Sequence, residues 1–418
     1  MKGTEFIFYM RIEMLMGVAT SATQIEGGDK NNTWYRFSKT GKCVDGTNCL
    51  RAADHYNRYR EDIDLMASLG VEIYRMSLEW SRIEPQKGVF NKEAIDHYRD
   101  ELEYFIEKGI KPLVTLHHFS DPIWFADMGG FEKKKNVKYF LEYVEKVIES
   151  FGDIVSEFVT INEPNVYILN GYMIAYWPPL KGNYITGFRV CKNMARCHIE
   201  AYKLIHKMRE EMGYKDTKVS FANHMVYFVP KNEKNTIHRM CTALYEYLFH
   251  TMINNSFYEG KTPLFMGKRL ESGKYYDFIG INYYTRRAIG YFTSNEYKGE
   301  SKSDLNWDIY PEGIRLITED LYKKFKKEVY ITENGICDKN DILREKYIKD
   351  HIRELVYEGS PVTRYYHWSF LDNFEWREGE HARFGLVHVN YETQKRTVRK
   401  SAEFYKRLIK EKSTELLK

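Results

Sequence analysis

Short runs of apolar and β-branched residues alternate along the chain with longer stretches in which apolar residues recur every three or four positions. The short runs predict buried strands, and the longer stretches predict amphipathic helices. The strands are expected at residues 14–19, 71–78, 110–117, 157–161, 218–222, 276–282, 328–332 and 362–370. The helices are expected at residues 54–69, 92–108, 137–151, 188–212, 236–257, 311–325, 344–358 and 399–412.

This order of elements predicts an α/β protein built as a single (β/α)8 TIM barrel, with residues 1–418 forming one catalytic domain. No linker or low-complexity segment interrupts the alternation. The longest stretch expected to be irregular is 283–310, between the sixth strand and the helix after it. In such barrels the chemistry lies at the C-terminal ends of the strands, so the polar residues found there are the candidate functional residues.

The composition narrows the class of partner. The 63 Lys and Arg residues and the 59 Asp and Glu residues are spread evenly, and no basic block of the kind that binds nucleic acid or anionic lipid is present. No apolar run reaches the ~18 residues of a membrane span, and the first residues lack a cleavable signal, which predicts a cytoplasmic protein. The six cysteines form no CxxC motif and are expected to be reduced, although Cys43 and Cys49 share one loop and could pair.

Two glutamates end short β-runs. Glu333 follows the run 329–332 and precedes an Asn-Gly turn, and Glu163 follows the run 158–162. Two carboxyl groups at two strand ends are what cleavage of a glycosidic bond requires. Other strand ends are also polar, at Gln24, Arg75, His118, Asn282, Tyr284, His367, Asp372, Asn373 and Glu375. One polar strand end could be a helix cap, but so many on one face of a barrel indicate a polar ligand.

Seven motifs lie between residue 19 and residue 376, in the order ATSATQIEGG, YRMSLEWSRIEP, TLHHFSDP, TINEPN, DFIGINYY, ITENG and HWSFLDNFEW. The segment RFGLVHVNYETQKRTVRKSAEFY continues the pattern nearly to the C-terminus. The whole set closely resembles family 1 glycoside hydrolases, the β-glucosidase family. The resemblance implies a (β/α)8 barrel and a retaining mechanism, with no cofactor and no metal.

The resemblance also assigns catalytic roles. Glu333 matches the family's nucleophile, which must be ionised, and Arg75 matches the cation that would hold the pKa of that carboxyl down. Glu163 matches the acid/base, which must begin the reaction protonated. Tyr284 matches the tyrosine that hydrogen-bonds the nucleophile, whereas Tyr283 would point the other way on a strand. A purely structural Glu–Arg pair is the alternative for Glu333 and Arg75.

Further residues match the family's sugar pocket or its entrance: Gln24, His118, Asn162, Trp307, Trp368, Glu375, Trp376 and Phe384. Amides, histidine and a carboxylate can bond the hydroxyls of a hexose, and tryptophan can pack on its C–H face. Buried capping and core packing are the alternatives for these residues. His117 is expected to point away from the pocket, and a zinc site built from His117, His118 and Glu163 lacks ligand spacing.

The end of the chain bears on the substrate. Relatives that act on 6-phosphosugars carry serine, lysine and tyrosine where this sequence has Glu375, Ala382 and Phe384. A carboxylate at this place would repel a phosphate, which favours an unphosphorylated hexose. Arg377 and Arg383 lie nearby in the sequence and leave the phosphorylated alternative open.

Four positions depart from the family pattern, because Met16, Thr23, Phe119 and Asn165 stand where the family usually has aromatic residues. Several of them are expected to line the pocket or its entrance, so these replacements would affect aglycone preference and stability. The chain is also shorter than is usual in the family, mainly after the sixth and seventh strands. Shorter loops there predict a more open leaving-group side, or loops completed by a partner subunit.

These observations together predict a retaining exo-β-glycosidase, a β-glucosidase with β-galactosidase or β-fucosidase side activity. The expected substrates are small β-glucosides or oligosaccharides with an unphosphorylated terminal β-D-hexoside, and the expected state is a monomer or a homo-oligomer. Three alternatives remain: a 6-phospho-β-glycosidase, an endo-glycanase on the same barrel, and a non-catalytic sugar-binding barrel.

Overall fold

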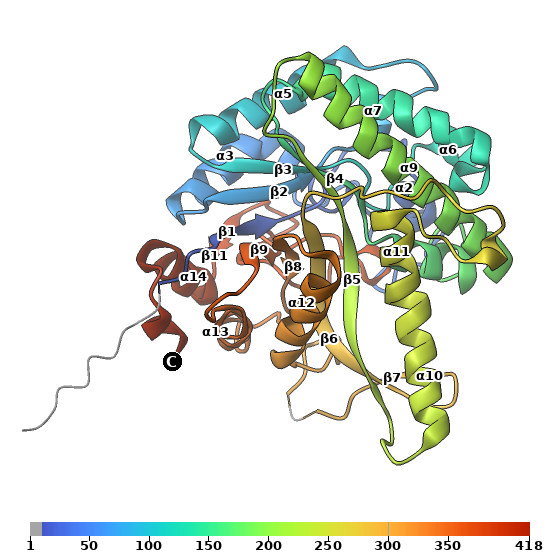
Figure 1. Ribbon diagram of the computed structural model, residues 1–418. Coiled ribbons are helices and arrows are strands. Elements are labelled where there is room, and N and C mark those ends of the chain that lie inside the picture. The colour runs from blue at the N-terminus through green and yellow to red at the C-terminus, as the bar shows by residue number, and fades with distance from the viewer. Residues whose placement is uncertain (1–10, 300) are drawn as a thin grey trace, which may run out of the picture.

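The computed structural model describes residues 11–299 and 301–418, and within them eight parallel strands close into a barrel (Figure 1). Each strand pairs with the next in the order β1–β2–β3–β4–β5–β6–β8–β9, and β9 pairs with β1 to complete the ring. The strands are β1 (Leu15–Ala19), β2 (Ile73–Ser77), β3 (Lys111–Thr115), β4 (Glu157–Asn162), β5 (Lys218–Pro230), β6 (Ile279–Ile289), β8 (Val329–Asn334) and β9 (Val362–Trp368). The predicted (β/α)8 barrel is therefore confirmed.

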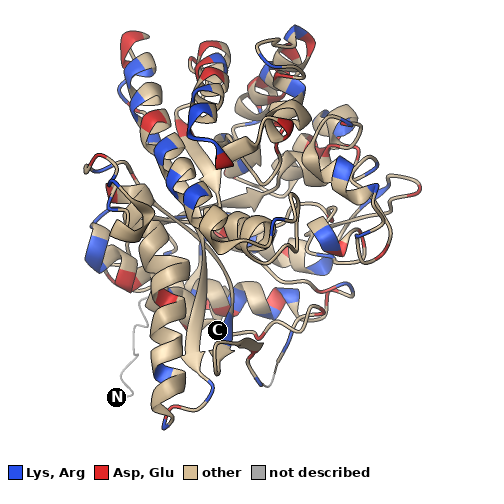
Figure 2. Cartoon of the chain, turned by 90° about the vertical axis from the view of Figure 1, so that its right-hand side faces the viewer, with Lys and Arg blue, Asp and Glu red and all other residues tan. Residues whose placement is uncertain are grey.

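The helices lie around the outside of this ring (Figure 1). The long ones are α3 (His55–Ser68), α5 (Lys92–Glu107), α7 (Val137–Phe151), α9 (Tyr184–Glu211), α10 (Thr236–Glu246), α11 (Met252–Glu259), α12 (Glu312–Phe325), α13 (Arg344–Leu355) and α14 (Lys400–Glu411). Shorter ones are α1 (Ala22–Ile25), α2 (Thr33–Ser38), α4 (Trp80–Ile83), α6 (Ile123–Asp127) and α8 (Pro164–Tyr167). In the view of Figure 2, basic and acidic residues are interspersed along the outer helices.

The barrel strands are buried along almost their whole length because helices cover their outer faces and side chains fill the ring. Part of the interior is apolar, with Ile73, Leu113, Val159 and Phe278 in one buried cluster. Near the N-terminal ends of the strands, Glu157 accepts hydrogen bonds from Lys111 Nζ and Arg364 Nη2, each at 2.6 Å. Side chains therefore fill the ring, as in other barrels of this kind, whose ligands bind at the C-terminal ends of the strands.

Two neighbouring strands are longer than the sequence pattern predicts. β5 continues eight residues past the expected end at 222, and β6 reaches Ile289, well into the stretch expected to be irregular. The prediction that 283–310 is irregular is wrong for its first part, because β6 keeps pairing with β5 as far as Pro230 opposite Ile289. A short antiparallel strand, β7 (Ser294–Glu296), then folds back on β6. The pair forms an arm that extends beyond the barrel alongside α10 (Figure 1).

Two of the differences between the helical predictions and the structure concern the long helices beside β5. α9 begins four residues before the expected start, where the Asn183 side chain accepts a hydrogen bond from the Thr186 backbone N–H at 2.8 Å. The helix expected at 236–257 consists of α10 and α11 joined by a π-helical turn over Tyr247–Thr251. Such turns insert an extra residue and redirect the side chains that follow.

The six cysteines are all buried and none is bonded to another, so Cys43 and Cys49 do not pair. Within residues 11–299 and 301–418, no helix has both the length and the apolarity needed to cross a membrane.

Candidate active site

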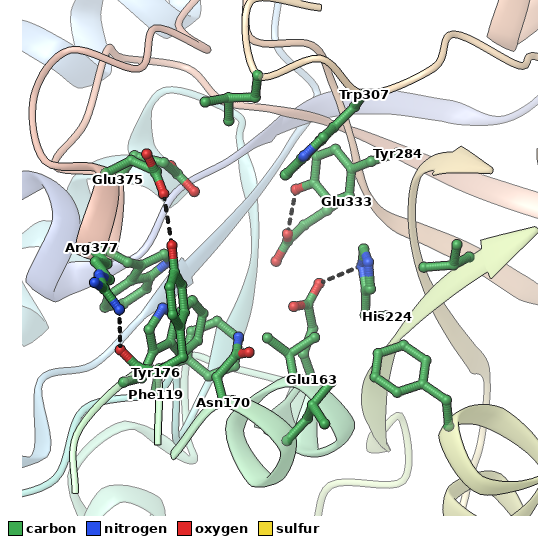
Figure 3. Close-up of a pocket in the computed structure, with 18 of the residues that line it drawn as sticks. Phe119, Glu163, Asn170, Tyr176, His224, Tyr284, Trp307, Glu333, Glu375 and Arg377 are labelled. Atoms are coloured by element: carbon green, nitrogen blue, oxygen red, sulfur yellow. Dashed lines mark hydrogen bonds and ion pairs between the residues drawn. The ribbon is translucent and has the colours of Figure 1, made fainter. Parts of the chain in front are cut away.

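A cavity of about 570 Å³ opens at the C-terminal ends of the barrel strands, and Glu163 and Glu333 both line it. The two carboxyl groups point toward one another across the cavity (Figure 3). They come from different sides of the ring, because Glu163 follows β4 and Glu333 lies in β8. Two glutamates that lie 170 positions apart in the sequence therefore share one site.

Glu333 is held in place by two donors. Arg75 in β2 forms an ion pair with Oε1, and the Tyr284 hydroxyl donates a hydrogen bond of 2.6 Å to Oε2. Burial raises the pKa of Glu333 to about 7, Arg75 and Tyr284 act against that rise, and the charge of Glu163 adds to it. Gly335 permits the close approach of the chain after Glu333 to the end of β9, since a Cβ there would lie 1.7 Å from the Trp368 carbonyl oxygen.

Glu163 lies at a sharp turn between β4 and α8. Its φ of 39° is in the left-handed region, which is uncommon for a residue with a side chain and typical of strained functional positions. Asn282 Nδ2 donates a hydrogen bond of 2.8 Å to Glu163 Oε1, and His224 Nδ1 lies 3.3 Å from the same oxygen. The turn and these two neighbours aim the carboxyl group into the cavity.

Asn162 links the surroundings of the two glutamates. Its Oδ1 accepts hydrogen bonds from Arg75 Nη2 at 2.7 Å and from Asn282 Nδ2 at 3.0 Å. Its Nδ2 lies 3.0 Å from His118 Nε2 and must donate to it, because an amide nitrogen has no lone pair to offer. Burial, and next the charge of Arg75, lower the pKa of His118 well below its usual value, so the ring is neutral with its proton on Nδ1. That Nδ1–H has no partner among the described residues, and His118 lines the cavity.

The opposite end of the cavity carries Glu375 and a group of aromatic rings. Glu375 Oε2 accepts hydrogen bonds from Asn373 Nδ2 at 2.8 Å and from Gln24 Nε2 at 3.1 Å. Burial raises the pKa of Glu375 to about 8, so at neutral pH its carboxyl group can also donate a hydrogen bond. The His118 ring lies nearly parallel to Trp368 and Trp376, with centroid distances of 5.8 and 5.9 Å. This end therefore offers polar atoms next to flat apolar faces, the combination that suits a sugar ring.

Most of the residues picked out by sequence meet in this cavity. Its wall includes His118, Glu163, Tyr284, Trp307, Glu333, Trp368, Glu375, Trp376 and Phe384. Arg75, Gln24 and Asn162 are fully buried just behind the wall and bond to residues that form it. Tyr283 points away, and its hydroxyl donates to the Tyr310 carbonyl oxygen at 2.6 Å.

The chain matches one known protein family over almost its whole length. The sequence model of glycosyl hydrolase family 1 matches residues 9–414. The chain belongs to this family. It is 33% identical to β-glucosidase A of Thermotoga maritima, with 96% of this chain and 98% of the relative covered. β-Glucosidase A of Acetivibrio thermocellus is 32% identical, with 95% and 97% covered.

Solved structures of the family superpose on this chain over almost its full length. A β-glycosidase from Pyrococcus horikoshii is 35% identical, with a TM-score of 0.89 and 98% of both chains covered. The β-glucosidase of Thermotoga maritima in complex with glucoimidazole is 32% identical, with a TM-score of 0.90 and 97% and 99% covered. The chain is therefore a glycoside hydrolase of the family 1 type.

The four departures from the family pattern do not all lie at the cavity. Phe119 lines it, but the expectation that several of the four do so is wrong for Met16, Thr23 and Asn165. Met16 packs in the buried core, and Thr23 donates its hydroxyl proton to Glu79. Asn165 Nδ2 donates to the carbonyl oxygens of His224 and Phe249, at 2.7 and 3.2 Å. Asn165, at a position where the family usually has a tryptophan, thus connects α8 to the β5 arm by hydrogen bonds.

His117 and the two arginines near Glu375 have partners of their own. His117 Nε2 lies 3.0 Å from Asp121 Oδ1, outside the cavity. Among the described residues, no group of three His, Cys, Asp or Glu side chains could hold a metal ion. Arg383 donates to Asp372 at 3.3 Å, whereas Arg377 lies at the cavity rim with its guanidinium 4.1 Å from the Tyr176 ring centroid.

Sequence reasoning missed the wall formed by the β5 arm and the neighbouring helical segments. His224, Val226 and Phe228 lie on the part of β5 beyond its expected end, and Phe249 lies in the π-helical turn. The run of apolar residues from Met225 to Val229 was the signal that the strand continues. The polar pair Asn223–His224 interrupted that pattern and hid the continuation.

Proposed function

We propose that this enzyme is a retaining exo-β-glucosidase that hydrolyses terminal, unphosphorylated β-D-glucosides. The observation that carries the proposal is the setting of Glu333, whose two oxygens are separately engaged by Arg75 and Tyr284 opposite Glu163. A carboxylate fixed by a cation and a phenol is suited to in-line attack on an anomeric carbon.

In the first step Glu333 attacks the anomeric carbon while Glu163 donates its proton to the departing oxygen. The charge of Glu163 raises the pKa of Glu333, so Glu333 is the better nucleophile when Glu163 is neutral. The negative charge on Glu333 then lies next to Arg75 and Tyr284. The bond between sugar and leaving group breaks, and a covalent glycosyl-Glu333 ester forms.

In the second step Glu163, now ionised, takes a proton from water, and the water oxygen attacks the anomeric carbon. The ester bond breaks and Glu333 leaves as a carboxylate. His224 and Asn282 stabilise the charge on Glu163 during this step, because both lie at its Oε1. Two inversions at the same carbon restore the β configuration.

The pocket around the sugar supports glucoside recognition. His118 Nδ1–H and the carboxyl group of Glu375 offer hydrogen bonds to hydroxyls, and the indole of Trp368 offers an apolar face. Asn162, just behind the wall, donates one Nδ2 hydrogen to His118 and has the other to offer to the 2-hydroxyl of a bound sugar, a contact that strengthens in the transition state. The activity on β-galactosides and β-fucosides is part of the same proposal, because such sugars differ from glucose only at one or two hydroxyls. The relatives named β-glucosidases point to the same sugar.

The proposal is tested with Glu333→Gly on an aryl β-glucoside. We expect hydrolysis to fall by at least about 10⁴-fold and azide to restore part of the turnover, forming the α-glucosyl azide in the space that the carboxylate leaves. Glu358→Gly, in an exposed turn outside the cavity, is the matched control and should keep full activity. Unchanged hydrolysis in Glu333→Gly would contradict the proposal. So would a proton NMR time course in which the unmodified enzyme first releases the α-anomer.

Assays with further substrates separate the alternatives. A 6-phospho-β-glycosidase would cleave only the phosphorylated aryl glucoside, an endo-glycanase would depolymerise long xylan or cellulose faster than cellobiose, and a sugar-binding barrel would bind glucose without turnover at any pH. Against the phosphorylated substrate, Ala382 and Phe384 supply no cation, and Arg383 is engaged by Asp372.

A further inference from the structure

A second cavity of about 480 Å³ lies beside α9, and its wall shares no residue with the catalytic cavity. Six basic side chains line it: Lys134, Arg189, Lys192, Arg196, Lys268 and Arg269. Only two acidic side chains do so, Glu200 and Glu271. Neither the barrel core nor the proposed reaction accounts for such a concentration of positive charge.

The two carboxylates do not neutralise the basic residues of the groove. Lys203, which is not part of the wall, lies 2.7 Å from Glu271 Oε2 and 3.6 Å from Glu200 Oε1. Four of the six cations, Lys134, Arg189, Lys268 and Arg269, are exposed and make no ion pair with any carboxylate of the described residues. On the outer helices elsewhere, by contrast, most arginines are paired, as Arg99 is with Asp153 and Arg315 is with Glu354.

The floor of the groove is formed by partly buried cations. Lys192 Nζ donates to the Met266 carbonyl oxygen at 2.8 Å, and Arg196 Nη1 donates to Asn193 Oδ1 at 3.4 Å. These partners are neutral, so the charges remain unbalanced. Burial, and next the positive charges of Arg196 and Lys134, lower the pKa of Lys192.

The cations are arranged in a row. Arg189, Lys192 and Arg196 lie on successive turns of α9 and span about 10 Å along its axis at 1.5 Å per residue. Lys268 and Arg269 face this row from the loop after the 3-10 turn Leu264–Met266. An anion that satisfies both rows must itself be extended and carry several charges.

We propose that this groove binds a linear chain of phosphates, of which tripolyphosphate is the smallest probe. Phosphate oxygens are the acceptors that arginine and lysine bond most strongly, and the volume of the groove is that of a small-molecule site. Its described wall contains no aromatic side chain, so it offers no stacking surface for a nucleobase or a sugar ring. It is recessed between a helix and a loop, which favours a narrow chain over a folded acidic partner.

Isothermal titration of the full-length protein with tripolyphosphate tests the proposal. At about 50 mM salt we expect one molecule to bind per chain, with affinity falling steeply toward about 200 mM salt. The variant Arg189→Gln/Lys268→Gln/Arg269→Gln removes three exposed cations without an ion-pair partner, so it should fold normally and bind at least about tenfold more weakly. Its turnover of an aryl β-glucoside should match that of the unmodified protein, which verifies the fold.

The control Lys400→Gln/Arg407→Gln/Lys410→Gln removes the same charge from α14, on another side of the barrel (Figure 1). Equal weakening by this control would overturn the proposal, because binding would then follow net charge alone. The absence of any binding at low salt, or orthophosphate binding as tightly as tripolyphosphate, would also overturn it. If a hexaglutamate peptide binds more tightly than tripolyphosphate, the proposal is overturned and the ligand of the groove is an acidic protein.

Discussion

The His224 Nδ1 atom lies 3.3 Å from the Glu163 Oε1 atom, and His224 stands on the part of β5 that continues beyond the barrel. A ring N–H at this distance stabilises the negative charge that Glu163 carries at the start of the second step. We predict that His224→Ala slows hydrolysis of the glycosyl-enzyme by about threefold to tenfold, because Glu163 then lacks this neighbour when it takes a proton from water.

The test of this role separates the two steps with 2,4-dinitrophenyl β-glucoside. Departure of 2,4-dinitrophenolate needs no proton, so kcat/KM, which reports the first step, should change little in His224→Ala. With so good a leaving group the second step limits kcat, so kcat should fall. An unchanged kcat would contradict the assignment of His224.

The hydrogen bond from Tyr284 to Glu333 leads to a prediction about the acidic limb. The pKa of Glu333 is raised to about 7, and Tyr284 is one of the groups that oppose the rise. Tyr284→Phe removes that opposition, so the pKa should increase. Since Glu333 acts only as a carboxylate, the acidic limb of kcat/KM should move to higher pH, by about one unit. Tyr283→Phe is the matched control, because its hydroxyl bonds the Tyr310 carbonyl oxygen instead.

The apolar wall of the leaving-group side predicts a preference for apolar aglycones. Val226, Phe228, Phe249 and Ile174 line this part of the cavity. The value of kcat/KM should therefore rise from methyl to butyl to octyl β-glucoside. Burial of one CH₂ group contributes about 0.8 kcal/mol, which corresponds to an increase of up to about fourfold for each group that becomes buried. Phe249→Ala should flatten the series.

The control for that series is Phe265→Ala, which truncates an exposed phenylalanine outside the cavity and should leave the series unchanged. If cellobiose is hydrolysed faster than octyl glucoside, the wall accepts a sugar as the leaving group and the prediction is wrong.

A buried histidine between two helices links stability to pH. His55 Nδ1 lies 2.8 Å from Asp62 and its Nε2 lies 3.0 Å from Glu101. Burial lowers the pKa of His55, but the hydrogen bonds to Asp62 and Glu101 outweigh it and raise the pKa to about 10. The folded-state pKa exceeds the value of about 6.5 in an unfolded chain, so this stabilisation is complete below about pH 6.5 and disappears as pH rises through about 10.

The variant His55→Gln should therefore lower the midpoint of thermal unfolding most at pH 6, with the difference from the unmodified protein shrinking steadily toward pH 10. Differential scanning calorimetry across this range measures it, with His381→Gln, at an exposed position, as the control. A difference that does not depend on pH would mean that His55 contributes packing alone.

The sequence by itself determined the barrel and both glutamates. Eight strands alternate with helices, the number and order of a (β/α)8 ring, and the runs that end in Glu163 and Glu333 carry local signals of strand and turn. Local backbone preference and apolar spacing are short-range properties, and they can be read within ten to twenty residues.

The tertiary structure decided what surrounds those glutamates. The pairing of Arg75 with Glu333 joins positions 258 residues apart, and the approach of His224 to Glu163 depends on β5 and β6 pairing beyond the ring. Strand length here follows from the partner strand and not from local pattern, because a strand continues wherever its backbone groups find hydrogen bonds. The wall of the leaving-group side could not be predicted from the family's aromatic positions. It is built by the β5 arm and the π-helical turn, which lie elsewhere in the chain.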